Sequence, residues 1–182
     1  MGDPRTRLFG QKIHQDSEWG FAFWRPLNWK RLDLTEQHGV VYYPEHDPQT
    51  GFYVLTRAFG AELNEAIGEA DLPALYEGVV EGLHKLPGCR VLDEKEIAKE
   101  SAIGFEFLLT WSLKKDAAKR RMRFLYKDRQ QITLYGQGVP ASEYDLFANI
   151  FDWMYLTFTF EDLAEQVAEM YPDPHSPPEA QP

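Results

Sequence analysis

The chain has 182 residues, of which 43% are hydrophobic and 14% aromatic, and its formal net charge is −10. This length suits one domain, and so much apolar content excludes global disorder. The single Cys89 excludes an intramolecular disulfide and a cysteine-cluster zinc site, and we expect no cofactor. No stretch approaches the ~18 apolar residues of a membrane span, and residues 1–12 hold no apolar run of signal-peptide length. We therefore expect a cytoplasmic protein without a transmembrane segment.

The charge is unevenly distributed along the sequence. Residues 61–113 carry eleven acids and four bases, residues 114–140 carry eight bases and two acids, and residues 141–182 carry nine acids and no base. A general nucleic-acid-binding protein presents a broad basic surface. The sequence therefore gives no strong nucleic-acid signal, and it singles out one basic segment between two acidic ones.

The segment Gly20–Trp29 marks the beginning of an antiparallel sheet. Phe21 and Phe23 alternate on one face of a strand. Pro26 ends that strand because proline has no N–H to donate, and Trp29 opens the next one. The pattern of aromatic and β-branched residues predicts three more strands, over residues 29–34, 39–44 and 52–59, with a turn over 46–51.

From Asp71 the apolar period changes from two residues to 3.6, which predicts a helix. Asp71 is a suitable N-cap, Pro73 lies in the first turn where its missing N–H matters little, and Pro87-Gly88 ends the helix. The next strands are expected over residues 90–99, 105–111, 121–126 and 132–136, with a charged connection over 114–120 and a turn over 127–130.

A second helix is expected near the C-terminus of the domain. Ser142 is predicted to cap it, with Asp145 three residues on as an acidic variant of the capping box. Glu161–Met170 predicts a short acidic helix, and residues 172–182, with five prolines, predict a mobile tail.

Together these elements predict an α+β fold in a single domain. Most strands are separated by links of hairpin length, so the sheet is expected to be antiparallel and sandwiched by helices, in an α/β/α arrangement. We divide the chain into an N-terminal extension over 1–17, an α+β domain over 18–160, and an acidic short helix with a proline-rich tail over 161–182.

Several of these features occur in a characteristic order. They are the pattern Gly20-Phe-x-Phe-x-x-Pro-x-x-Trp29, the turn closed by Gly51, the helix from Asp71, the strand Gly104-Phe-Glu-Phe and the aromatic last helix. Over roughly residues 18–160 the chain resembles the PsbP-like superfamily. That superfamily includes the extrinsic subunit of the oxygen-evolving complex, a eukaryotic Ran-binding protein and bacterial DcrB-like proteins. The resemblance implies an antiparallel sheet between helices and a role as a binding or assembly factor. It transfers no catalytic residue, because the members share no active site.

The basic segment is the feature that most indicates a function. We expect a compact positive surface on a hairpin link, formed by Lys114, Lys115, Lys119, Arg120, Arg121 and Arg123. Such a surface could dock an acidic protein, an anionic membrane or RNA. The alternative is a solvated turn whose charge is offset by the protein's own acidic helices, since charged turns also protect sheet edges from aggregation. Because Arg121 and Arg123 alternate with apolar residues, they should share one face of the sheet.

Aromatic residues supply a second set of candidate contacts. Trp24 and Trp29, on either side of the Pro26 bend, are the two tryptophans that we expect to be partly exposed. Most of the other aromatic residues are expected to pack in the core.

Other residue groups could carry chemistry, but each has a simpler interpretation. A metal or acid/base cluster would have to join the two ends of one strand, at His38, Glu45, His46 and Asp47. These ends lie more than ~20 Å apart at ~3.3 Å per residue, so exposed loop residues are the simpler interpretation. Cys89 beside Arg90 could be a nucleophile with a lowered pKa, although a half-buried packing thiol is more typical. Gly136-Gln-Gly138 lacks the pattern of a phosphate loop and predicts a twist or bulge in a strand.

We therefore expect a non-enzymatic protein-interaction or assembly/chaperone-type domain whose protein partner has an acidic surface. The alternative is a carrier of a small apolar ligand in an aromatic-lined cleft. A hydrolase that uses Cys89 or the His46-Asp47 pair is the least favoured hypothesis.

Overall fold

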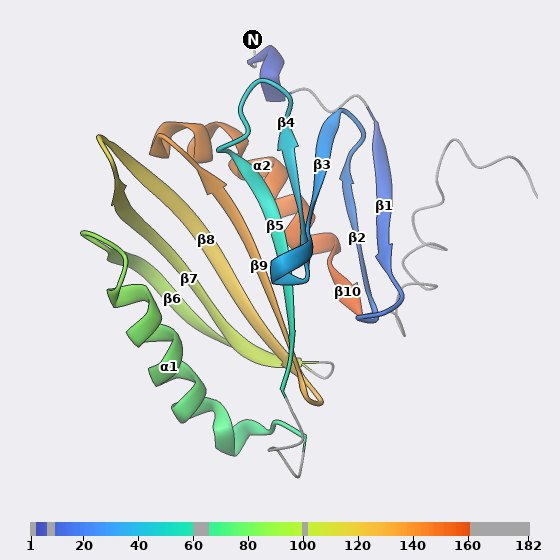
Figure 1. Ribbon diagram of the computed structural model, residues 1–182, viewed down its shortest axis with the longest axis vertical. Helices are drawn as coiled ribbons and strands as arrows, with labels where there is room; N and C mark the ends of the chain where they lie inside the picture. Colours follow the sequence, from blue (N-terminus) through green and yellow to red (C-terminus); the bar gives the residue numbers. More distant parts are fainter. Residues whose placement is uncertain (1–2, 7–9, 60–65, 100–101, 161–182) are drawn as a thin grey trace, which may run out of the picture.

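The structure is a computed structural model that describes residues 3–6, 10–59, 66–99 and 102–160 (Figure 1). Within these residues it contains two helices and ten strands, apart from short 3-10 turns. The helices are α1 (Leu72–His84) and α2 (Ala141–Thr157). The strands are β1 (Gln11–Asp16), β2 (Phe21–Pro26), β3 (Trp29–Leu34), β4 (Gly39–Pro44), β5 (Gly51–Ala58), β6 (Arg90–Lys99), β7 (Ala102–Leu113), β8 (Asp116–Lys127), β9 (Gln130–Gly138) and β10 (Thr159–Phe160). No described helix is long and apolar enough to cross a membrane.

A seven-stranded antiparallel sheet forms the centre of the molecule, in the order β3-β4-β5-β9-β8-β7-β6. Neighbours in the sheet are mostly neighbours in the chain, as the short predicted links require. The exception is the pair β5 and β9, which lie side by side in the sheet although α1 and β6–β8 separate them in sequence. The predicted α+β fold with a large antiparallel sheet is confirmed.

A second, three-stranded sheet has the order β1-β2-β10 and stands beside the first (Figure 1). Its edge strand β1 lies in the segment that we had assigned to an N-terminal extension. The sequence Gln-Lys-Ile-His-Gln-Asp is mostly polar, and His14 alone is buried in it. That composition hides the strand pattern, because an edge strand buries few side chains. The predicted helix over 161–170 and the tail over 172–182 lie outside the described residues.

The two helices pack on opposite sides of the large sheet (Figure 1). Successive residues of a strand point to opposite faces, so the sheet separates two cores. On one face α2 packs against residues that include Val54 and Leu134. On the other face α1 packs against residues that include Phe107 and Leu109. The predicted sandwich of a sheet between helices is confirmed.

The beginning of α2 differs from the predicted capping box. The helix begins at Ala141 after Pro140, and Ser142 makes no capping hydrogen bond, so that prediction was wrong. Asp145, the expected partner of Ser142, instead accepts a hydrogen bond from Lys119 on β8, 2.6 Å away. A charged partner on the sheet therefore takes the place of the local cap.

The Gly136-Gln-Gly138 sequence in β9 lets α2 lie very close to the sheet. A Cβ atom added at Gly138 would lie 2.0 Å from the backbone nitrogen of Tyr144, and one at Gly136 would lie 2.6 Å from Cγ of Phe151. The pairing of β8 with β9 continues through both glycines. They serve the approach of the helix rather than the predicted twist or bulge.

Candidate functional site

The basic segment does not form the compact surface that the sequence predicts. Strands β7 and β8 extend to a tight turn at Lys114 and Lys115, so the predicted connection over 114–120 was too long. The other four cations, at residues 119, 120, 121 and 123, belong to β8 itself. Alternation along a strand then sends them to opposite faces of the sheet.

Three of these cations lie on the α2 side, and each has an acidic partner. Lys119 pairs with Asp145 on α2, and Arg121 pairs with Asp152, about two turns further along the same helix. Arg123 donates to Glu106 on β7 through Nε at 2.9 Å and Nη2 at 2.6 Å. Arg121 and Arg123 share one face, as predicted.

Glu106 is the centre of this network. Its side chain is 5% exposed and also contacts Lys95 Nζ at 2.8 Å and Arg121 Nε at 3.5 Å. Burial alone would raise the pKa of Glu106, but hydrogen bonds from Lys95 and Arg123 and the charge of Arg121 lower it below its usual value. The network therefore neutralises much of the basic segment from within the protein.

Arg120 is the exception, because its side chain lies alone on the α1 side. Its guanidinium carbon lies 4.6 Å from the ring centre of Trp111 and 4.2 Å from that of Tyr135. Nε and Nη2 donate to the side-chain oxygen of Gln137, and Nη1 faces the sulfur of Met122 at 3.7 Å. No carboxylate among the described residues forms a salt bridge with it.

Trp24 and Trp29 are buried, so the expectation that they are partly exposed was wrong. Each is 4% exposed. Trp29 packs edge-on against Phe147 and Phe151 of α2, with ring centres 5.8 and 5.9 Å apart. The Pro26 bend carries the chain from the small sheet to the large one, and α2 covers both. The two tryptophans therefore belong to the interior, although Leu27 in the turn between them is 50% exposed.

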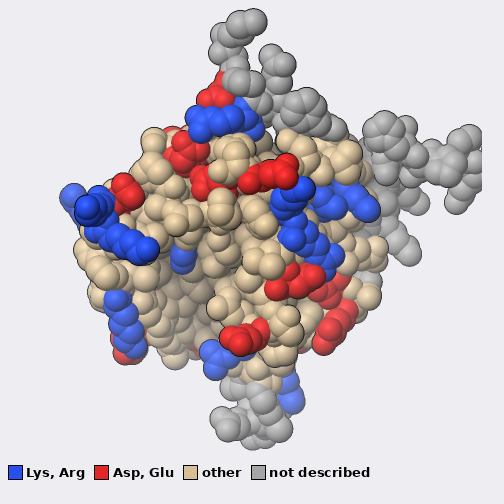
Figure 2. All heavy atoms as spheres, turned by 45° about the horizontal axis from the view of Figure 1, so that its top comes forward, with Lys and Arg blue, Asp and Glu red and all other residues tan. Residues whose placement is uncertain are grey.

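The β7–β8 turn is the exposed part of the predicted basic surface. Lys114 and Lys115 are exposed, and within the described part of the chain neither pairs with an acid. Leu113 beside them is 37% exposed. Figure 2 shows basic side chains gathered at one corner of the molecule and mixed charges over the rest of that face.

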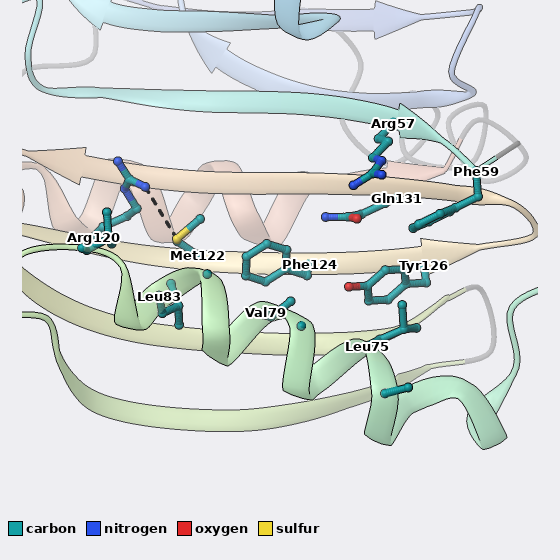
Figure 3. A pocket seen from close by; sticks show the side chains of 14 residues that line it. Arg57, Phe59, Leu75, Val79, Leu83, Arg120, Met122, Phe124, Tyr126 and Gln131 are labelled. Carbon is teal, nitrogen blue, oxygen red and sulfur yellow. Dashed lines mark hydrogen bonds between the residues drawn. The ribbon is translucent and has the colours of Figure 1, made fainter.

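A groove runs between α1 and the sheet and encloses about 480 Å³. Met122, Phe124 and Tyr126 of β8 form its floor, and Leu75 and Val79 are among the residues that α1 contributes. Figure 3 shows Arg120 at one end of the groove and Arg57 with Phe59 at the other. The sequence raised an aromatic-lined cleft only as an alternative, without residues to place it. One usable signal was that Arg120 has the same strand phase as the apolar residues 122 and 124.

The groove exists because α1 lies loosely on the sheet. Only Leu72 and Leu83 of α1 are buried. Gly78 and Gly82 line the groove, and an added Cβ at either glycine would meet nothing within 4 Å. Both glycines are exposed, so this side of the helix has no side chain there to cover β8.

The other candidate groups do not assemble into a site. His38 and His46 lie at opposite ends of β4, and no three His, Cys, Asp or Glu residues in the described ranges are placed to hold a metal. Burial raises the pKa of the Cys89 thiol, contrary to the lowered value that a nucleophile needs. The Asp47 carboxylate accepts the backbone N–H of Gln49 and stabilises the turn.

His14 on β1 is a buried titratable residue that the sequence did not indicate. It is 7% exposed and shares a hydrogen bond of 3.0 Å with the hydroxyl of Tyr42 through Nδ1. Burial, with a smaller contribution from Arg31, lowers the pKa of His14 to about 4. It borders a second cavity of about 260 Å³, but its Nε2 atom is itself buried without a partner.

Solved structures with this fold come from several organisms. CyanoP, the cyanobacterial PsbP of Synechocystis sp. PCC 6803, has a TM-score of 0.61 at 11% identity, covering 83% of this chain and 92% of CyanoP. LpqN of Mycobacterium tuberculosis, described as involved in cell envelope biogenesis, has a TM-score of 0.54 at 14% identity, covering 87% and 86%. The Ran-binding protein Mog1p of Saccharomyces cerevisiae has a TM-score of 0.51 at 12% identity, covering 85% and 97%.

These similarities establish the class of fold. The chain has the PsbP-like fold, as the sequence resemblance predicted. At these identities the likeness concerns the fold alone. No family model and no curated protein matches the sequence.

Proposed function

We propose that this protein is a non-catalytic interaction domain that binds a protein partner through the β7–β8 turn. A solved structure of the same fold, Mog1p, is described as a Ran-binding protein, which supports a binding role for the fold. The observation that carries the proposal for this chain is the exposed pair Lys114 and Lys115 at the tip of a long hairpin. The partner is expected to present an acidic surface at this point.

Few of the candidate residues remain accessible to such a partner. Lys119, Arg121 and Arg123 are already paired with acids, and Trp24 and Trp29 are buried. Replacing these residues would disturb the fold as well as any interface. Lys114 and Lys115 can be changed without that complication, and the neighbouring Leu113 adds an exposed apolar contact.

The test is affinity capture from the source cells with a charge-reversed turn, Lys114→Glu with Lys115→Glu. The control is Lys12→Glu with Lys30→Glu, which changes the net charge equally at exposed positions of β1 and β3. Lys30 loses an exposed ion pair with Glu45, which contributes little to stability. We expect a partner that the wild type and the control retain and the turn variant loses, with capture that weakens at high salt. Equal capture by the turn variant and the wild type would contradict the proposal, as would capture of no protein.

A second candidate function is a carrier of a small apolar ligand, and the groove under α1 favours it. The groove volume of about 480 Å³ lies within the range of small-molecule sites. Its floor is apolar and aromatic. Native mass spectrometry of the purified protein should then show a bound small molecule that Gly78→Leu, which would fill the groove, removes.

A further inference from the structure

Arg120 is a desolvated cation on the α1 side of the sheet, and it has no acidic partner among the described residues. Three cations of β8 that face α2 are each paired with an acid. Its guanidinium is held between Trp111 and Tyr135, and its polar contacts are to Gln137 and the Met122 sulfur. Burial lowers the pKa of Arg120 below its usual value, and the neighbouring Tyr135 and Tyr53 oppose this shift. Removing a charge from water without a counter-charge is unfavourable. An anion at Nη1 would relieve that penalty.

The groove that begins at Arg120 has a matching chemistry. Arg120, Met122, Phe124 and Tyr126 follow one another on the same face of β8, so they span about 20 Å at ~3.3 Å per residue. No acidic side chain is among the described residues that line the groove. The groove is thus elongated and apolar, and it leads away from the Arg120 cation.

We infer that this groove binds an unbranched aliphatic carboxylate, with its head group on Arg120 and its tail along Met122, Phe124 and Tyr126. The inference rests on the second candidate function, the carrier, and names the chemistry of its ligand. The planar guanidinium can donate to a carboxylate in a charge-assisted hydrogen bond. The tail would cover the apolar floor that α1 leaves open.

Arg57 at the other end of the groove is a weaker anchor for the head group. It is exposed, and its guanidinium carbon lies 5.4 Å from the ring centre of Phe59. Water already solvates an exposed cation, so an ion pair there contributes little. Arg57 therefore provides a matched control, because it is an arginine of the same groove that the ligand's head should not need.

The experiment compares decanoate with decanol, which have the same chain and differ in head-group charge. Isothermal titration calorimetry of the wild-type protein should show decanoate binding roughly tenfold to a hundredfold more tightly than decanol. Arg120→Met should remove this preference and leave decanol binding unchanged. Arg57→Gln should change neither affinity by more than about twofold, and Gly78→Leu should block both ligands.

The outcomes separate the inference from the function on which it rests. Equal affinity of the wild type for decanoate and decanol would overturn the carboxylate inference while the carrier function stands. Absence of binding for both compounds would overturn both. A preference lost in Arg57→Gln and kept in Arg120→Met would overturn the assignment of the head group to Arg120. If Arg120→Met does not fold, the wild-type comparison of the two compounds still decides whether the groove prefers an anion.

Discussion

The two faces of the large sheet are built very differently. On the α2 face six residues of the helix are buried, the glycines of β9 allow close contact, and Lys119, Arg121 and Arg123 each have an acidic partner. On the α1 face two residues of the helix are buried, a groove remains open, and Arg120 lacks an acidic partner among the described residues. The α2 face is closed by packing and ion pairs, and the α1 face has space for a ligand.

This difference arises within a single basic segment. Neighbouring residues of β8 differ only in strand phase, yet Arg121 stabilises the fold and Arg120 faces a groove. The lesson is that density of charge in a sequence does not define a binding surface. Which face each side chain reaches, and what covers that face, decides whether a charge is structural or free to bind.

The largest expected effect comes from removing the central acid of the closed face. Glu106→Ala would leave Lys95, Arg121 and Arg123 without their shared partner, and breaking a buried ion pair in this way destabilises by about 3–5 kcal/mol. Urea denaturation measures the loss. The control Glu81→Ala breaks an exposed pair with Lys85 on α1 and should leave the midpoint unchanged. A similar small change for Glu106→Ala would show that the network does not stabilise this face.

Acidification should lower the free energy of unfolding through His14. This residue contacts Phe21 and Phe23 in the core on the α2 side. The folded pKa of His14 is about 4, below the ordinary value near 6.5. The unfolded chain therefore binds more protons between these values. Stability should fall by up to about 3 kcal/mol as the pH drops from 6.5 to 4.

The check on this pH dependence is to measure unfolding free energy from pH 7.5 to pH 4 for the wild type and for His14→Phe. The variant should lose the slope between pH 6.5 and 4. Glu106, whose pKa is lowered, contributes in the same direction only below its ordinary value of 4.5. An unchanged slope in His14→Phe would show that groups other than His14 carry the acid sensitivity.

The close approach of α2 to β9 gives the next largest effect. In Gly138→Ala the new Cβ would lie 2.0 Å from the backbone nitrogen of Tyr144, so the helix must move. We expect a loss of about 1–3 kcal/mol, as for overpacking in a core, measured by urea denaturation. A wild-type midpoint in this variant would show that α2 can shift without loss and that the closed face is less tightly packed than its contacts indicate.

Much of the fold followed from sequence because alternation and helical spacing are local signals. Phe105, Phe107 and Leu109 predicted a central strand, and the period change at Asp71 predicted α1. The polar strand β1 was not predicted, because an edge strand that buries one side chain shows little apolar alternation. The antiparallel order and the sandwich of helices followed from link lengths.

The candidate site was much less predictable, because it depends on what covers each face. The length of the β7–β8 hairpin was underestimated, since Lys119 and Arg120 read as part of a charged turn. The partners Asp145 and Asp152 come from a helix that follows β9 in sequence, so no local pattern connects them to β8. The burial of Trp29 likewise depends on α2, because Phe147 and Phe151 of that helix pack against its ring.

The smallest expected effect has the opposite sign and comes from the open face. Gly78 lies inside α1, and an added Cβ meets no atom within 4 Å, so Gly78→Ala should stabilise the protein by about 0.5–1 kcal/mol through helix propensity. Urea denaturation measures this gain beside the loss in Gly138→Ala. Because Gly78 also lines the groove, the same methyl group should weaken decanoate binding. A destabilised Gly78→Ala would mean that α1 packs more closely on the sheet than an open groove allows. If instead the variant gains stability and binds decanoate as the wild type does, the ligand site lies elsewhere, and the openness of this face reflects loose packing alone.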